Sequence, residues 1–348
     1  MPRIHDLYDL RTRLQAGLDD DREVLSGYGA TRSPRLKAYL LESNSRSLDD
    51  FGCPLGRWDT LNQKGWYINR GGVYPECIFL DMTHPRVWIL YSVLGIRESD
   101  AIVEKWVKEN IGLDRCWLSR QQLLHWERND EWYQKGLGIR YSDGLSPDDD
   151  AGYLSLKLWH GASNAIKDFD SVLELAKERF AINSARWQKK REGRVVIAAE
   201  WYSNGKVTVQ KAEDIDEVLL SILATARTYG EAIEEATNLR DKKMGAFELD
   251  FSQGIDLNAF SKVVSSGKGN MNLWLVETES QDADTFKRFR GVDLHTWDRV
   301  SISMGEDFAH LTIPGNGCVN AAPRIATLQG EDNAGRTTIS FDGVELFA

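Results

Sequence analysis

The sequence predicts an α+β protein made of two units that a long helix connects. Three observations lead to this fold class. Helix-type and strand-type segments alternate along the whole 348-residue chain, the composition changes near residue 212, and a long apolar stripe with helical spacing follows that change. We expect a Trp-rich mixed α/β unit over residues 1–212, a linking helix over 213–244 and an acidic α/β unit over 245–348.

The charge balance differs between the two parts of the chain. Residues 1–212 hold 31 Lys and Arg against 30 Asp and Glu, a balance of +1, and residues 213–348 hold 12 against 23, a balance of −11; the two add up to the net −10 of the chain. Ten of the 12 Trp residues lie in the first part. Because an acidic surface repels phosphates, the sequence favours the first unit for any contact with a polyanion.

The first unit reads as a succession of short elements. Apolar spacing predicts helices over 4–25, 99–111, 119–128 and 165–180, and strands over 65–69, 77–81, 87–94, 137–141, 153–159, 182–188 and 195–202. Asn204-Gly205 then predicts a tight hairpin, since these two residues tolerate the positive φ angles of a type I′ turn.

The second unit begins after the clearest helix of the chain. Residues 214–242 keep one apolar stripe, with acids at the first turn, basic residues at the last and Gly245 placed to end the helix. Strands and the two helices expected at 257–264 and 319–328 then follow in an order that we interpret as β-α-β-β-α-β. This order resembles a ferredoxin-like unit, by element order alone.

The sequence favours a cytoplasmic protein. No apolar run approaches the roughly 18 residues that span a bilayer, and the N-terminus lacks the apolar core of a secretory signal. The four cysteines, Cys53, Cys77, Cys116 and Cys318, have neither disulfide-type nor zinc-type spacing, which is typical of reduced thiols. We expect no metal site and identify no cofactor.

One candidate centre combines a thiol with an imidazole. Cys318 lies in a glycine-rich turn that opens a predicted helix, where the helix dipole would favour a thiolate. His295 lies between two carboxylates, Asp293 and Asp298, either of which could orient its ring. The hypothesis is a nucleophilic Cys318 that His295 activates; the alternative is a buried cysteine beside an ordinary turn.

The same turn allows a non-covalent interpretation as an anion site. Backbone N–H groups from Gly317 to Asn320, with Arg324 and the later Arg336, could hold a phosphate or a nucleotide. The turn has no Gly-Lys-Ser/Thr, so it is not a P-loop. The alternative is that its glycines serve only to turn the chain.

Basic residues beside aromatic ones suggest contact with nucleic acid. Five cations lie within residues 186–194, and the candidate contacts there are Arg186, Trp187, Lys189, Lys190 and Arg191. Residues 286–291 form a shorter segment of the same kind, and residues 31–37 a third. Cations neutralise phosphates and flat rings stack on bases. The competing interpretation is a solvated turn, and the pI near 5.2 disfavours a dedicated nucleic-acid binder.

Two further polar groups have weaker signals. Asp81 and His84 follow an apolar strand and could bind a metal or move a proton, although a turn-capping Asp81 explains them as well. Asp148, Asp149 and Asp150 fit a solvated loop better than a cation site.

The function that the sequence favours is a non-catalytic recognition or accessory subunit of a cytoplasmic multi-protein system. We expect a protein partner, allow for nucleic acid, for example in defence against foreign DNA, and expect no membrane contact. The alternative is a Cys/His-dependent enzyme or a small-anion sensor that uses the turn from Gly315 to Arg324.

Overall fold

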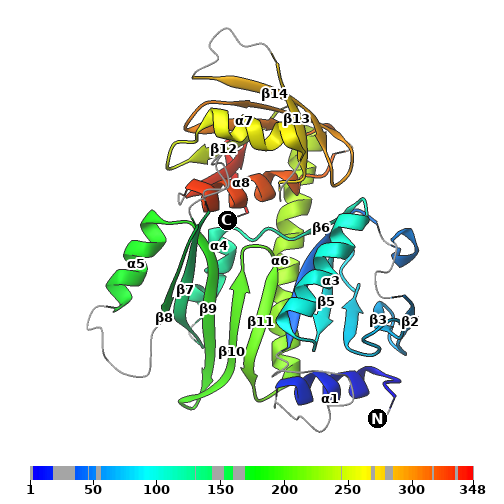
Figure 1. Cartoon of the computed structure of the whole chain (residues 1–348). Coiled ribbons are helices and arrows are strands. Elements are labelled where there is room, and N and C mark those ends of the chain that lie inside the picture. Colours follow the sequence, from blue (N-terminus) through cyan, green and yellow to red (C-terminus); the bar gives the residue numbers. More distant parts are fainter. Residues whose placement is uncertain are drawn as a thin grey trace. The chain divides into compact units, whose positions relative to one another are not determined.

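The computed structural model is rich in β-structure, with 38% of residues in strands and 32% in helices. It describes residues 3–18, 36–45, 47–51, 56–129, 131–142, 153–159, 169–243, 245–267, 271–278, 285–315, 317–333 and 336–347. The acidic stretch 148–150 and the basic residues 31–35 lie outside these ranges, so the predictions of a solvated loop and of nucleic-acid contact there stay predictions. Two antiparallel sheets organise the described residues (Figure 1).

The first sheet has eleven strands, ordered β2-β3-β4-β5-β1-β11-β10-β9-β7-β8, with β6 paired to β1. The strands are β1 (Lys37–Ser43), β2 (Trp58–Thr60), β3 (Trp66–Asn69), β4 (Ile78–Asp81), β5 (Val87–Ser92), β6 (Leu113–Arg115), β7 (Trp132–Ser142), β8 (Tyr153–Trp159), β9 (Ile182–Arg191), β10 (Arg194–Tyr202) and β11 (Lys206–Ala212). The predicted hairpin at Asn204-Gly205 is confirmed, since it joins β10 to β11, but the predicted type I′ turn is wrong: Gly205 has φ +74, whereas Asn204 is not among the described residues with positive φ.

The second sheet has seven strands, ordered β13-β14-β15-β16-β12-β17-β18. These are β12 (Phe247–Phe251), β13 (Leu273–Thr278), β14 (Lys287–Asp293), β15 (Arg299–Met304), β16 (Phe308–Thr312), β17 (Thr337–Phe341) and β18 (Val344–Leu346). Neighbouring strands whose register is defined all run antiparallel.

Seven α-helices and two short 3-10 helices accompany the sheets among the described residues. They are α1 (Leu7–Leu18), α3 (Ile96–Glu109), α4 (Arg120–Leu123), α5 (Phe169–Arg179), α6 (Ile215–Lys242), α7 (Leu257–Ser266) and α8 (Ala321–Asn333), with η1 (Leu48–Asp50) and η2 (His125–Arg128). The long helix predicted over 214–242 is confirmed as α6. No helix in the described part of the chain is both long enough and apolar enough to cross a bilayer.

The α+β prediction with a ferredoxin-like second unit is wrong, because the structure is mostly β and its second sheet has seven strands. The β-α-β-β-α-β order required two helix-connected crossovers between a few strands. Instead β13 to β16 form a continuous meander, in which each strand pairs with the next one along the chain. The basic–aromatic segment 286–291 lies mostly in β14, and β18 adds a further strand after β17.

Two compact units can be distinguished, and each is described by itself. The first contains residues 1–116, 125–134 and 186–230, and the second contains 117–124, 135–185 and 231–348. Both are therefore assembled from separate stretches of the chain. The boundaries proposed from composition, at residues 212 and 244, remain a prediction.

The core of the first unit contains most of the described Trp residues. Trp88 and Trp106 are almost fully buried, and Trp126 and Trp132 stack with their ring centres 4.6 Å apart. Aromatic burial on this scale accounts for much of the apolar area removed from water, since each such ring buries about 150–250 Å². The Trp-rich composition therefore reflects core packing in this unit.

A row of polar residues crosses the centre of the first sheet. Lys37 on β1 lies opposite Ser92 on β5 and Thr208 on β11, and Thr208 lies opposite Glu200 on β10. All four side chains are buried. Directly opposed residues share one face of a sheet, so the four lie side by side in an otherwise apolar interior.

The second sheet has one buried and one open face. Residues alternate along its strands, so that Phe247, Leu249 and Phe251 on β12 are buried while Glu248 and Asp250 between them are exposed. Helices α7 and α8 accompany this sheet (Figure 1), and Phe260 of α7 packs edge-on against the buried Phe289 at 5.5 Å between ring centres. The opposite side, which we call the outer face, carries the exposed residues.

Candidate functional site

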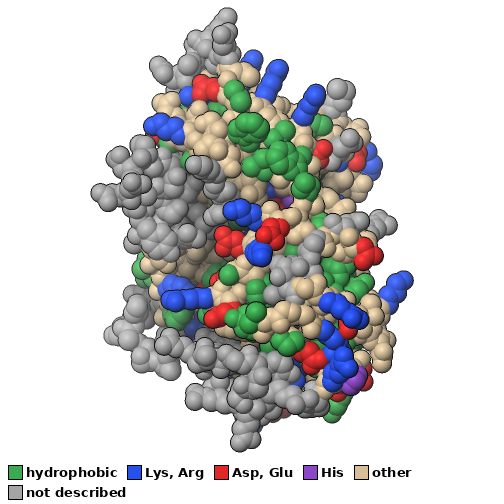
Figure 2. Space-filling view, turned by 45° about the vertical axis from the view of Figure 1, so that its right-hand side comes forward, with side chains coloured by type: hydrophobic (Ala, Val, Ile, Leu, Met, Phe, Trp, Pro, Cys, Tyr) green, Lys and Arg blue, Asp and Glu red, His purple; other side chains and the backbone are tan. Residues whose placement is uncertain are grey.

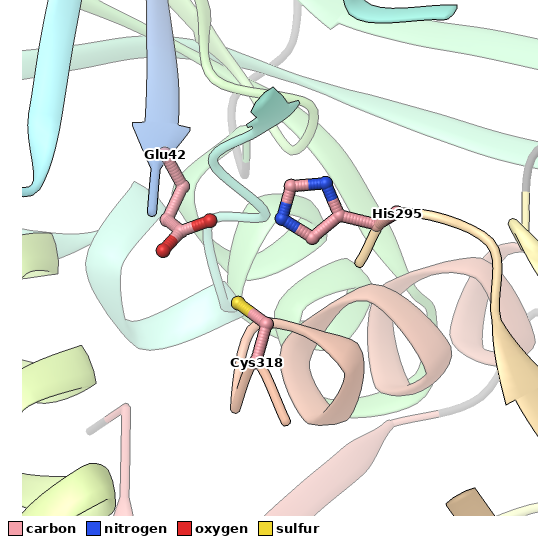
Figure 3. Close-up of side chains that lie close together, drawn as sticks. All are labelled: Glu42, His295 and Cys318. Carbon is pink, nitrogen blue, oxygen red and sulfur yellow. The ribbon is translucent and has the colours of Figure 1, made fainter. Parts of the chain in front are cut away.

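The structure brings His295 and Cys318 of the second unit together. His295 lies in the turn between β14 and β15, and Cys318 lies just before α8. A ring nitrogen of His295 and Sγ of Cys318 are within 4.8 Å of each other. Figure 3 shows the sulfur and the imidazole on the same side of the loop that leads into α8. The figure also draws Glu42, which belongs to the first unit and forms an ion pair there with Arg86.

The predicted orienting carboxylate of this centre has other partners. Asp293 Oδ1 accepts a hydrogen bond from Arg324 Nη2 at 2.6 Å and one from the backbone N–H of His295 at 3.0 Å. Asp293 thus fixes the turn through the main chain of His295. Asp298 is half-buried, and its carbonyl accepts the backbone N–H of Asp293 at 2.9 Å. These two acids shape the turn that carries His295.

The residues predicted to hold an anion do not converge on one open site. The N–H of Gly317 donates to the carbonyl of Pro314 at 2.8 Å, and Arg240 donates to the carbonyls of Gly315 and Gly317. Arg324 is fully buried against Asp293 and Asn320 is fully buried as well. The turn therefore directs carbonyl oxygens toward the Arg240 guanidinium, whereas an anion site requires N–H groups that point at the ligand.

Arg336 lies apart from that turn, at the rim of an apolar pocket of the second unit. About 670 Å³ of empty space there, open solvent included, is bounded by α8, β17, β18, the first turn of α4 with the two residues before it, and residues 180–182; the lining side chains include Pro323, Ile339 and Leu346. Its enclosed part is only about 60 Å³, which is smaller than the cavity of about 150 Å³ that holds a benzene ring.

The predicted nucleic-acid segment of the first unit is largely neutralised by its own carboxylates. Lys189 pairs with Glu131 at 3.0 Å, and Arg191 pairs with Glu217. Trp187 is only 1% exposed, so its ring has no free face on which a base could stack. The remaining members are half-buried; Lys190 lies over the ring of Tyr133 at 4.6 Å, and Arg186 is on β9.

Asp81 and His84 form a turn rather than a set of converging ligands. Asp81 Oδ1 accepts the N–H of Thr83 at 2.8 Å, and His84 Nδ1 accepts the N–H groups of Arg86 and Val87 at 3.2 and 3.0 Å. Burial raises the pKa of Asp81 above its ordinary value. Both side chains thus accept backbone N–H groups of one turn, so the turn-capping explanation fits both residues.

A group of basic and apolar residues lies on the outer face of the second sheet. We define the basic–aromatic patch as Trp274 and Val276 on β13, Arg288 and Arg290 on β14, and Arg299 at the start of β15. Trp274 is 51% exposed and Val276 62%, and all three arginines are exposed. Figure 2 shows hydrophobic side chains next to Lys and Arg in the upper part of the view, where Figure 1 labels β13 and β14.

Strand register places the patch residues next to one another. Trp274 lies opposite Val292, which lies opposite Arg299, so these three form one row across the sheet. Val276 lies opposite Arg290 in the next row, and Arg288 belongs to the row after that. Successive rows on one face are separated by about 7 Å, because two residues of a strand span that distance.

Charge on the outer face is divided between its two sides. The arginines lie on β14 and β15, whereas the exposed acids Glu248 and Asp250 lie on β12, beyond β16. Among the residues that the structure describes, Arg290 and Arg299 have no carboxylate within 4 Å; Arg288 lies over the ring of Phe286 at 5.4 Å. The arginines thus keep their charge available at the surface, although the second unit as a whole is acidic.

The alternation of buried and exposed side chains along β14 is the signal that could have revealed the patch from the sequence. The segment Lys287-Arg288-Phe289-Arg290 was recognised as basic and aromatic, but as a run rather than as two faces. Lys287 points inward and pairs with Glu277 at 3.0 Å, and Phe289 is in the core. Burial would raise the pKa of Glu277, but hydrogen bonds from Lys287 and Ser261 lower it overall. A period of two, applied to this segment, separates the inward pair from the outward arginines.

The fold and the patch define a β-rich protein with two antiparallel sheets, of which the second has a solvent-exposed face. The chain belongs to the MJECL33-like protein family, whose family model matches residues 30–330 and so includes the whole basic–aromatic patch. It is similar to the uncharacterized protein MJECL33 of Methanocaldococcus jannaschii, with 22% identity over 346 residues that cover 83% of this chain and 82% of the relative. No solved structure matches it.

Proposed function

We propose that this protein is a non-catalytic recognition subunit that binds the phosphate backbone of nucleic acid with the outer face of its second sheet. The observation that carries the proposal is the set of three exposed arginines, Arg288, Arg290 and Arg299, in successive rows of one open face. Arginine binds phosphate oxygens through two parallel hydrogen bonds, and such contacts supply most of the affinity of non-specific binding.

The acidity of the rest of the chain is compatible with a phosphate contact limited to one face, whereas a general binder of polyanions would be basic overall. Glu248 and Asp250 lie on the same face, with β16 between their strand and the arginine-bearing β14 and β15, so their charge favours a bound strand on the arginine side. An accessory subunit of a cytoplasmic multi-protein system, for example in defence against foreign DNA, needs such a limited contact. The buried, unbridged Cys77, Cys116 and Cys318 are consistent with a reducing compartment.

The proposal is tested by the salt dependence of binding. Fluorescence anisotropy with labelled single-stranded and duplex DNA, between about 50 and 200 mM salt, should give affinities that fall steeply with salt. Replacing Arg288, Arg290 and Arg299 by Ala should weaken binding and lower the slope of log K against log salt by about one for each arginine that contacts a phosphate.

The matched control removes the same charge from the first unit by replacing Lys190, Arg191 and Arg194 with Ala. We expect this variant to keep the slope and most of the affinity of the native protein. If the control loses as much slope as the outer-face variant, the location on the second sheet is wrong. Salt-independent affinities in the native protein would rule out the function itself.

A second candidate function is thiol chemistry at Cys318, which its approach to His295 within 4.8 Å favours. Cys77 is the internal comparison, because burial raises the pKa of its thiol to about 12. If His295 activates Cys318, iodoacetamide at neutral pH should label Cys318 faster than Cys77, as peptide mapping would measure, and His295→Ala should remove the difference. Equal labelling of the two thiols would leave Cys318 as a buried apolar residue.

A further inference from the structure

The basic–aromatic patch contains a feature that phosphate binding alone does not require, namely an exposed tryptophan on its edge strand. Trp274 is 51% exposed, although tryptophan is on average a well-buried residue. It lies on β13, the edge strand of the sheet, and Val276, two residues further along the same face, is 62% exposed. An exposed apolar pair beside arginines indicates a ligand that has an apolar part as well as a charged one.

One side of the Trp274 side chain lies close to the backbone at the end of α7. A Cβ placed on Gly267, the left-handed residue that ends α7 with φ +61, would lie 3.5 Å from Cγ and from Cδ1 of Trp274. This close approach positions the indole while about half of its surface stays open to solvent. A positioned ring loses little conformational freedom when another flat ring stacks on it.

We propose that the basic–aromatic patch binds single-stranded rather than duplex nucleic acid, with a base stacked on Trp274 and phosphates on the arginines. This inference rests on the proposed function and names the form of its ligand. In a duplex the bases are stacked on one another, so the outer face could contact only the sugar–phosphate backbone of a duplex. In a single strand the base faces are accessible to aromatic side chains.

The order of the residues across the sheet suits an extended strand. Arg299 is in the same row as Trp274, Arg290 is in the next row and Arg288 in the third. With rows about 7 Å apart, the three guanidinium groups can follow a backbone that runs along the strand direction of β14. The ring of Phe286, half-buried with the Arg288 guanidinium 5.4 Å from its centre, supports this third arginine. Stacking on rings tolerates any base, so the patch should show little sequence preference.

The test makes four anisotropy measurements on the full-length protein: a labelled oligothymidylate and a labelled hairpin duplex of equal length, each alone and in competition with heparin. The oligothymidylate should bind more tightly than the duplex. Trp274→Ala should weaken oligothymidylate binding on the order of tenfold, within the range of one base–aromatic stack, and leave duplex binding unchanged. Trp274→Phe should keep most of the affinity, since it keeps a ring.

The matched control is Trp159→Ala on β8 of the first sheet, a tryptophan 46% exposed that lies outside the patch. It should bind oligothymidylate like the native protein, and circular dichroism should show both variants folded. If duplex or heparin competes as well as the single strand and Trp274→Ala binds normally, the single-strand inference fails while the proposed function survives. If no ligand binds in a salt-dependent manner, both fail.

Discussion

Replacing Arg324 by Met should destabilise the second unit by about 3–5 kcal/mol, the cost of leaving one member of a buried ion pair without the other. The Arg324 and Asp293 side chains are 0% and 1% exposed and lie 2.6 Å apart, so water cannot take the place of the missing guanidinium. Met fills a similar volume, which separates the loss of charge from the creation of a cavity. Urea unfolding followed by circular dichroism measures the change.

The double variant Arg324→Met/Asp293→Asn is the control for this interpretation. Removing the second charge should recover a large part of the loss, because no carboxylate is then left buried without its partner. The recovery should be incomplete, since the uncharged amide oxygen accepts the backbone N–H of His295 more weakly than the carboxylate does. If the single and double variants are equally unstable, the damage comes from packing and not from the unpaired charge.

Replacing Gly230 by Ala should destabilise the first unit, although alanine is the better helix former. Gly230 lies inside α6, where the exchange would normally stabilise by about 1 kcal/mol. A Cβ at this position would lie 2.3 Å from Cε1 of His84, closer than two carbon atoms can approach. The His84 ring cannot easily move, because two backbone N–H groups donate to its Nδ1. We expect a net loss of about 1–3 kcal/mol in thermal unfolding.

The sign of the Gly230→Ala effect should reverse when His84 is absent. In a His84→Ala background the ring no longer occupies the space, and Gly230→Ala should stabilise by the helix propensity alone. A double-mutant cycle on the four proteins therefore isolates the contact from the separate loss of the His84 hydrogen bonds. An unchanged destabilisation in both backgrounds would show that the ring is not the cause.

Elements whose structure depends on residues close in sequence, such as α6 and the hairpin between β10 and β11, could be predicted from the sequence. The charged ends and the single apolar stripe of α6 specify a helix wherever it packs, and Asn204-Gly205 specifies a tight turn by its backbone preferences alone. The pairing of β12 with β16 and β17 has no comparable local signal, because it joins strands that are far apart in sequence. The strand order of the second sheet could not be deduced from sequence because these pairings are long-range. The apparent β-α-β-β-α-β order therefore led to a wrong fold prediction.

The candidate sites show the same division between local and long-range information. Sequence identified Cys318 and His295 as reactive types, and only the fold could show that they approach each other. The sequence also predicted that Asp293 or Asp298 orients the imidazole, because nothing local indicates that Arg324, 31 residues after Asp293, binds the Asp293 carboxylate. Trp274 was passed over because it stands alone in the sequence; the patch forms when β14 and β15 place arginines beside it.

The polar row across the first sheet has a consequence for how that sheet assembles. Sliding β1 by one residue past β5 and β11 would turn Lys37 to the opposite side of the sheet, because side chains alternate. The native neighbours there are those of Ala38, which lies between Tyr91 and Val207. An ammonium group inserted among such side chains loses its hydration without gaining a counter-charge. Lys37 therefore specifies the register of the central strand, because a shift by one residue would bury its charge among side chains that cannot pair with it.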